Sequence, residues 1–346
     1  MRNISDSIYT AESSSSVLGT RQAHFIRRRL RRTVPLAGSI VLCLCSLLSR
    51  APLRAQGTLP QGPEYRYGVR VEMVNLFATV QNAAGKLVTN LRRDDFIVYE
   101  NGLPQFISRF GREYIPVSVI ILLDNSSSML AGKKLDNAKK ALSQFLERLR
   151  PGDEAMLITF RTRPKVVQDF TQHIERLRKE LRRLDGNGST ALYDAILTAL
   201  EEARKAHNQR RTLLLITDGL NTYGRAQIEE TIQRLRSEGT ELFAIGLESE
   251  LPENLQDKAI TRFVLDRLTQ SAGGESFTLS ESKRLGRICD TISDRIHNQY
   301  TFGYYPPPSS GEGWRSIRVV TRIAGLKITP SKTGYYAAGL PSLRSR

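Results

Sequence analysis

A short apolar run that ends in an aspartate constrains this chain more than any other feature. Residues 117–123 are Val-Ser-Val-Ile-Ile-Leu-Leu, and Asp124 follows directly. A run of this length and composition is typical of a strand buried on both faces, as in parallel sheets. Open α/β sheets bind their ligands in the crevice beyond the carboxyl ends of the strands. We therefore expect a binding site directly after Leu123.

The residues after this strand offer oxygen ligands. Residues 124–128 are Asp-Asn-Ser-Ser-Ser, which gives the pattern Asp-x-Ser-x-Ser. Carboxylate and hydroxyl oxygens suit Mg²⁺ or a similar hard cation. Taken alone, the motif has a simpler interpretation, in which Asp and Ser cap the start of the next helix.

Two later segments offer ligands of the same kind. Thr190 lies in a Gly-rich loop at 185–190, and Asp218 ends the apolar run Leu213–Thr217. Thr190 could also cap the helix that follows it, and Asp-Gly is a common turn pair. The occurrence of all three segments in this order, each at a strand end or a helix start, favours a single site.

These segments resemble the metal-ion-dependent adhesion site of the von Willebrand factor A domain. The matching positions are Asp124, Ser126, Ser128, Thr190 and Asp218. The resemblance implies Mg²⁺ (or Mn²⁺ or Ca²⁺), bound directly by the serines and sometimes the threonine, with the aspartates acting largely through water. It also implies an open coordination position, which an Asp or Glu carboxylate of a partner protein completes.

The segment around these motifs predicts an α/β fold with a doubly wound, mostly parallel sheet and helices on both faces, because strand-like and helix-like stretches alternate. The expected helices are 134–150, 174–184, 191–207, 226–238 and 280–298. Besides 117–123, the expected strands are 155–160, 166–167, 211–217, 241–246 and 275–279, with 166–167 antiparallel at one side.

Both flanks of this segment are rich in expected strands. These are 69–80, 96–100 and 103–110 before it, and 300–305, 316–323 and 326–329 after it. Each flank is too small to be stable alone, so we expect the two to pair into one small β domain with the α/β domain inserted. The predicted boundaries are 1–55 (leader), 66–112 (N-terminal β flank), 116–299 (A domain), 300–338 (C-terminal β flank) and 339–346 (tail).

The layout also resembles a bacterial subgroup of exported A-domain proteins first described in acidobacteria. The stretches that carry this resemblance are Leu87–Phe96 before the domain and Gly303–Pro306 after it. The subgroup implies no activity that could be assigned to this chain.

The first 55 residues have the pattern of a secretory signal peptide. A basic cluster at 27–32 precedes an uncharged apolar stretch at 34–48, and Leu53-Arg54-Ala55 provides a small residue at the cut site. The apolar stretch is shorter than the ~20 residues of a membrane-spanning helix, although an uncleaved anchor is the alternative. We expect a periplasmic, cell-surface or secreted protein that contacts the membrane through an uncleaved leader if at all. Cys43 and Cys45 lack a preceding lipobox, and cleavage after Ala55 leaves Cys289 as the one cysteine, so no disulfide is expected.

Charge adds little to the functional prediction. The chain has a formal charge of +16, of which nine arginines and two acids in residues 1–55 supply +7. The densest basic stretch, 176–183, could attract nucleic acid, but Leu177, Leu181 and Leu184 favour a helix with one inward apolar face. Because aromatic residues do not interleave with the basic ones, we expect no nucleic-acid partner.

Enzyme motifs are incomplete. Gly132-Lys133 lacks the remainder of a phosphate-binding loop. The serines after the strand lack the glycines of the Gly-x-Ser-x-Gly nucleophile elbow found in hydrolases. We therefore predict an exported, metal-dependent protein-binding or adhesion module that is not an enzyme. The alternatives are a metal-silent scaffold in the cell envelope, a hydrolase using a strand-end serine, and a cytoplasmic subunit of a chelatase or AAA-type ATPase.

Overall fold

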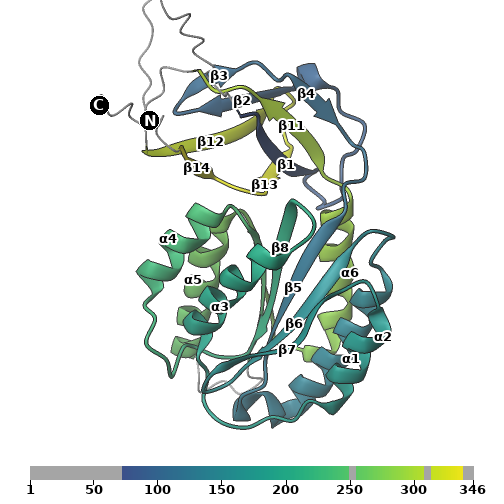
Figure 1. Ribbon diagram of the computed structural model, residues 1–346, viewed down its shortest axis with the longest axis vertical. Coiled ribbons are helices and arrows are strands. Elements are labelled where there is room, and N and C mark those ends of the chain that lie inside the picture. The colour runs from purple at the N-terminus through teal and green to yellow at the C-terminus, as the bar shows by residue number, and fades with distance from the viewer. Residues whose placement is uncertain (1–71, 249–254, 308–312, 338–346) are drawn as a thin grey trace, which may run out of the picture. The chain divides into compact units, whose positions relative to one another are not determined.

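A computed structural model describes residues 72–248, 255–307 and 313–337 (Figure 1). All of them belong to one unit, Arg66–Arg346. The predicted leader and the tail at 339–346 lie outside the described residues, as do the first positions of the strand expected at 69–80.

A six-stranded sheet forms the centre of the α/β domain. Its strand order is β10-β9-β8-β5-β6-β7, and all neighbours are parallel except β6 and β7. The strands are β5 (Val117–Asp124), β6 (Glu154–Phe160), β7 (Pro164–Thr171), β8 (Arg210–Thr217), β9 (Glu241–Leu247) and β10 (Gly274–Leu279). The chain starts at β5 in the middle and extends the sheet first to one side and then to the other, which confirms the doubly wound fold.

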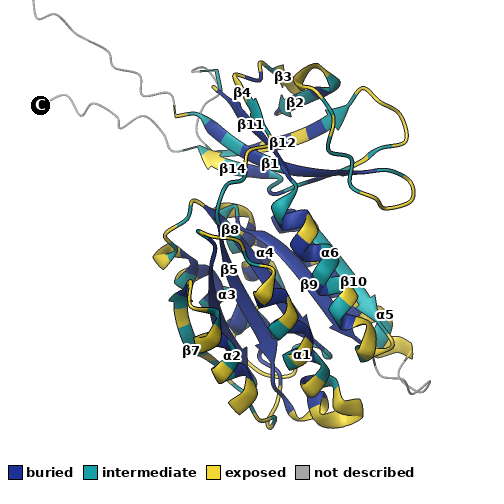
Figure 2. Cartoon of the chain, turned by 90° about the vertical axis from the view of Figure 1, so that its right-hand side faces the viewer, coloured by how far each residue is buried: buried dark blue, intermediate teal, exposed yellow. Residues whose placement is uncertain are grey.

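Helices cover both faces of this sheet, because successive side chains of a strand point to opposite faces. In β5, Ile121 and Leu123 pack into one core cluster, whereas Ile120 and Leu122 pack into the other. The first cluster contains residues of α1 (Lys134–Glu147), α2 (Ile174–Arg183) and α6 (Leu285–His297); the second contains residues of α3 (Leu192–Glu202), α4 (Ile228–Glu238) and α5 (Leu255–Ala272). Figure 2 shows the result, in which β5 is buried throughout and yellow, exposed positions lie on the outer helix surfaces.

The helices and strands differ from the prediction at several ends. The helix expected at 134–150 stops at Glu147, before a turn in which Gly152 has a φ of 92°, and the expected strand at 166–167 is the longer β7. Helix α5 was not predicted, because apolar residues lie on its exposed side as well as its buried side, for example Phe263 beside Val264. Four 3₁₀ helices complete the described part: Arg93–Asp95, Ser127–Lys133, Ala203–Lys205 and Ser282–Arg284.

The two flanks form a β domain of two four-stranded sheets, with orders β13-β1-β11-β4 and β14-β12-β2-β3. The strands are β1 (Val74–Gln81), β2 (Phe96–Glu100), β3 (Leu103–Gln105), β4 (Arg109–Gly111), β11 (Tyr300–Tyr304), β12 (Gly313–Thr321), β13 (Lys327–Pro330) and β14 (Gly334–Ala337). Each sheet joins strands from both flanks, since β1 pairs with β11 and β2 with β12. The predicted pairing of the flanks is thus confirmed.

The core of the β domain explains why neither flank would fold alone. Phe96 from the first flank packs against Tyr300 and Phe302 from the second, with ring centroids 5.1 and 5.0 Å apart. The strand expected at 103–110 is two strands in different sheets, β3 and β4, because the chain crosses the core at the buried Ile107 between them. Strand β14 was not predicted.

Candidate metal-binding site at the carboxyl edge of the sheet

Asp124 lies at the buried base of the predicted site. It ends β5 beside Phe160 of β6, and its side chain is fully buried. One carboxylate oxygen accepts a hydrogen bond from the Ser126 amide at 2.8 Å, and the other accepts one from the Thr217 hydroxyl at 2.6 Å. Burial raises the pKa of Asp124 to about 6, and these hydrogen bonds only partly oppose the shift. The site therefore contains a desolvated negative charge.

The other serines and the second aspartate that were predicted as ligands form a continuous chain of oxygens. The hydroxyls of Ser126 and Ser128 are 3.1 Å apart, and Ser128 Oγ donates to Asp218 Oδ1 at 2.7 Å. Ser126 takes the backbone position of an N-cap, yet its hydroxyl makes no capping hydrogen bond. The capping interpretation therefore does not account for the Ser126 side chain.

Thr190 is held beside the segment that carries Asp218. Its carbonyl accepts hydrogen bonds from the amides of Thr222 and Tyr223 at 2.9 and 3.0 Å. Thr190 Oγ1 lies 3.9 Å from the position that a Cβ on Gly219 would take. Within the described part of the chain, the Thr190 hydroxyl has no hydrogen-bond partner, and Ala191 takes the N-cap position of α3. The hydroxyl is thus free to bind a ligand, and all five predicted residues are gathered at one end of the sheet.

Lys134 is a member of this site that sequence reasoning missed. Its ammonium is 2.7 Å from Asp218 Oδ2, and the two side chains are only 13% and 1% exposed. Gly132 and Lys133, with φ values of 59° and 57°, form the turn that precedes Lys134 at the start of α1. The sequence shows a lysine ten residues after Asp124, but its position alone predicted only a helix start.

The donor set fits a hard divalent cation. Two carboxylates and three hydroxyls from three chain segments meet here, and one of the hydroxyls lacks a partner in the described part of the chain. The described residues contain no group of three or more His, Cys, Asp or Glu side chains with metal-binding geometry. A cation held here would therefore be one that accepts neutral hydroxyl ligands, such as Mg²⁺.

Within the described part of the chain, no histidine lies beside the serines of the site. His207 pairs with Glu154 at 2.8 Å, and His297 pairs with Asp153 at 2.9 Å. Glu154 begins β6, whereas the site lies where β6 ends. Both histidine pairs therefore lie at the amino ends of the strands, opposite the site. His173 is at the start of α2 and makes no side-chain contact with either serine.

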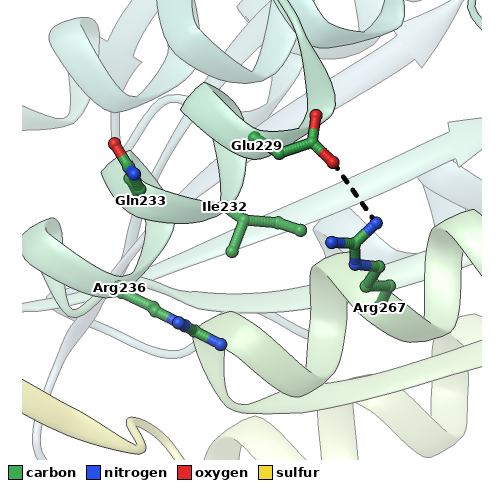
Figure 3. A pocket seen from close by; sticks show the side chains of 5 residues that line it. All are labelled: Glu229, Ile232, Gln233, Arg236 and Arg267. Carbon is green, nitrogen blue, oxygen red and sulfur yellow. Dashed lines mark ion pairs between the residues drawn. The ribbon is translucent and has the colours of Figure 1, made fainter.

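A small cavity of about 230 Å³ is lined by residues of α4 and α5 (Figure 3). Its lining residues are Glu229, Ile232, Gln233, Arg236 and Arg267. Glu229 and Arg267 form an ion pair at 3.5 Å across it. None of the predicted ligands lines this cavity.

Comparison with known proteins supports the prediction of an A domain. Residues 119–221 match the family model described as the von Willebrand factor type A domain. Inter-alpha-trypsin inhibitor heavy chain H1 of Sus scrofa is 28% identical over 173 residues, which are 46% of this chain and 19% of that protein. Heavy chain H4 of Homo sapiens is 27% identical over 166 residues, 43% of this chain and 18% of that protein. The chain thus spans less than a fifth of the length of these curated relatives.

Among solved structures, a von Willebrand factor type A protein from Catenulispora acidiphila is 12% identical, with a TM-score of 0.47 over 76% of this chain and 74% of its own. The family match shows that residues 119–221 carry a von Willebrand factor type A domain, a module that generally mediates protein–protein interactions. Within the described residues, no helix is both long enough and apolar enough to cross a membrane.

Proposed function

We propose that this protein is an exported binding module that holds a divalent cation and captures a carboxylate of a partner protein. Asp124, Ser126, Ser128, Thr190 and Asp218 would hold the ion. Mg²⁺ supplies an incompletely neutralised charge with an exchangeable coordination position, which an Asp or Glu side chain can fill. The role is binding and not catalysis.

The convergence of Ser126, Ser128 and Asp218 above a buried Asp124 carries this proposal. A buried carboxylate is unfavourable without a partner of opposite charge. Ser128 lies on the outer side of this arrangement and is exposed, which gives a partner access. A site with buried carboxylates and an exposed Ser128 hydroxyl can bind a cation and still present it to an incoming ligand.

Calorimetric titration of the purified protein with Mg²⁺ and with Mn²⁺ tests the proposal. We expect saturable binding that is abolished in Asp124→Ala and weakened in Ser126→Ala. Ser127→Ala is the matched control, because Ser127 lies between the two ligating serines and its hydroxyl makes no hydrogen bond within the described residues. Equal metal affinity in Asp124→Ala and the unmodified protein would falsify the assignment.

One observation favours a second candidate, a scaffold that works without metal. The Lys134 ammonium already supplies positive charge to Asp218 inside the site. In that case neither cation binds, and partner binding is unchanged by EDTA. The same titration, followed by a partner pull-down with and without EDTA, separates the two candidates.

Export is a separate part of the proposal, supported by the basic and apolar pattern of residues 27–55. Mass spectrometry of the protein recovered from the producing cell tests it. We expect a mature chain that begins at Gln56 and is found outside the cytosol. A full-length chain in the cytosol would favour the cytoplasmic subunit instead.

A further inference from the structure

Four loops surround the candidate site, and together we call them the rim: residues 125–134, 161–163, 185–190 and 219–226. They follow β5, β6, α2 and β8. The charged residues of the rim are Lys133, Lys134, Arg161, Arg163, Asp185 and Arg225. Five cations against one acid is a much stronger bias than in the chain as a whole, which has 51 basic and 35 acidic residues.

The contacts of these loops place the cations around the ligands. The Arg161 carbonyl accepts a hydrogen bond from the Ala191 amide at 2.8 Å, next to Thr190, and its guanidinium contacts the Asn187 side chain. Arg225 follows the stretch that is bonded to Thr190, and its amide donates to Asp194 at 3.2 Å. Lys133 immediately precedes Lys134, which is bound to Asp218.

Most of this positive charge is not neutralised by the protein itself. Within the described residues, no carboxylate lies at ion-pair distance from Lys133, Arg161, Arg163 or Arg225. Lys134, by contrast, is paired with Asp218. The basic helix α2 behaves differently, because Arg178 pairs with Glu147 and Glu175, and Arg183 pairs with Glu180. The charge of α2 is therefore partly balanced by neighbouring acids, while that of the rim is available to a partner.

The charge balance indicates how acidic that partner is. A divalent cation would cancel the two charges of Asp124 and Asp218, which leaves the five rim cations, Asp185 and the adjacent Asp194, or a formal charge of +3. A single carboxylate at the metal would still leave +2. Such a field accelerates encounter with an oppositely charged surface and favours complementary charges around the first contact.

We infer that the partner presents an acidic protein segment, in which the carboxylate at the metal is flanked by further Asp or Glu side chains that pair with Arg161, Arg163 and Arg225. This inference rests on the proposed function, because the metal fixes the central carboxylate. The rim also exposes Leu130 and Tyr223, at 56% and 49%, which suit apolar side chains of a protein. A nucleic acid fits less well, because a single exposed aromatic ring gives no series of stacking platforms.

Two labelled peptides test the inference by fluorescence anisotropy in Mg²⁺. One is Gly-Glu-Glu-Gly-Asp-Gly-Glu-Glu-Gly, and the other has Gln in place of every Glu. We expect the acidic peptide to bind about tenfold more tightly at low salt, with the advantage shrinking as salt rises. Replacing Arg161 and Arg163 together by Gln should weaken its binding about fivefold, as expected for the loss of two surface ion pairs.

The matched control replaces Arg176 and Arg182 of α2 by Gln, since both are exposed and neither has an ion pair within the described residues. Equal affinities for the two peptides, binding of neither, or an equal loss in the rim and control variants would overturn the inference. Tighter binding of an oligodeoxythymidine than of the acidic peptide would overturn it as well. A preference for the acidic peptide that persists in EDTA and in Asp124→Ala would support the acidic partner and refute metal dependence.

Discussion

Replacing Lys134 by Gln tests whether this side chain competes with a metal ion for Asp218. The ammonium is 2.7 Å from the carboxylate, and the pair is nearly shielded from water, with 13% and 1% of the two side chains exposed. A divalent cation that neutralises Asp218 would have to displace the ammonium or bind against its repulsion. The substitution removes the charge and keeps a polar end group, on a side chain that is one atom shorter.

The structure gives the size and sign of the effect. A hydrogen bond to a charged group contributes about 1.5–3 kcal/mol. Without metal, Lys134→Gln should therefore lower the free energy of unfolding by about that amount. If the ammonium competes, the same change should raise the Mg²⁺ affinity by roughly tenfold to a hundredfold, since each 1.4 kcal/mol is about a factor of ten. The two effects have opposite signs.

Urea unfolding in EDTA and Mg²⁺ calorimetry measure the two quantities. Lys133→Gln is the control, because Lys133 is the exposed neighbour and loses the same charge without losing an ion pair. We expect its Mg²⁺ affinity to change by less than about twofold, as screening weakens the effect of a solvated charge. Unchanged or weaker Mg²⁺ binding in Lys134→Gln would refute competition and leave Lys134 as a structural partner of Asp218.

Three further predictions concern the site and the sheet. Asp124→Asn should stabilise the metal-free protein at pH 8 and abolish Mg²⁺ binding. Because the native pKa of about 6 lies above the ordinary 3.8, the stability contributed by Asp124 is fully present below pH 3.8 and is lost as the pH rises through 6. Urea unfolding in EDTA should therefore show that Asp124→Asn raises the free energy of unfolding at pH 8, by at most about 3 kcal/mol, and leaves it unchanged near pH 4. An equal increase at both pH values would contradict the raised pKa of Asp124. Thr190→Ala should weaken binding of the acidic peptide more than binding of Mg²⁺, and equal losses would argue against a response of Thr190 to the ligand. Leu122→Ala, in the fully buried centre of β5, should lower the free energy of unfolding by about 2–5 kcal/mol in chemical denaturation, and a loss below about 1 kcal/mol would mean that β5 is not the packed centre of the domain.

The positions of the candidate oxygen ligands could be predicted because each lies in a local pattern. A buried strand is recognisable from its apolar run, and the residue after it is placed at the sheet edge by chain connectivity alone. Asp124 and Asp218 each follow such a run, and the structure places them where β5 and β8, adjacent and parallel, both end. The sequence also predicted that strands of the two flanks would pair, because neither flank has enough strands for a core.

Helix α5 and strand β14 could not be predicted for a common reason. Their apolar residues do not follow the period of one buried face, since Phe263 is 64% exposed in α5 and Tyr336 is 56% exposed in β14. Helix α5 acquires its position by packing against β9 and β10, and β14 by pairing with β12. These contacts join residues that no local window of sequence contains.

The sequence by itself determined the doubly wound fold, the strand-end position of each carboxylate, and the oxygen-rich character of the candidate site. These properties depend on side-chain periodicity and on ligand chemistry, which are local. Only the tertiary structure decided that Lys134 balances Asp218, that Thr217 binds Asp124, and that unpaired cations from separate loops surround the site. Such neighbours are up to 93 residues apart in the chain. Electrostatic interactions depend on distance and burial, and both are set only once the sheet has brought its strand ends together.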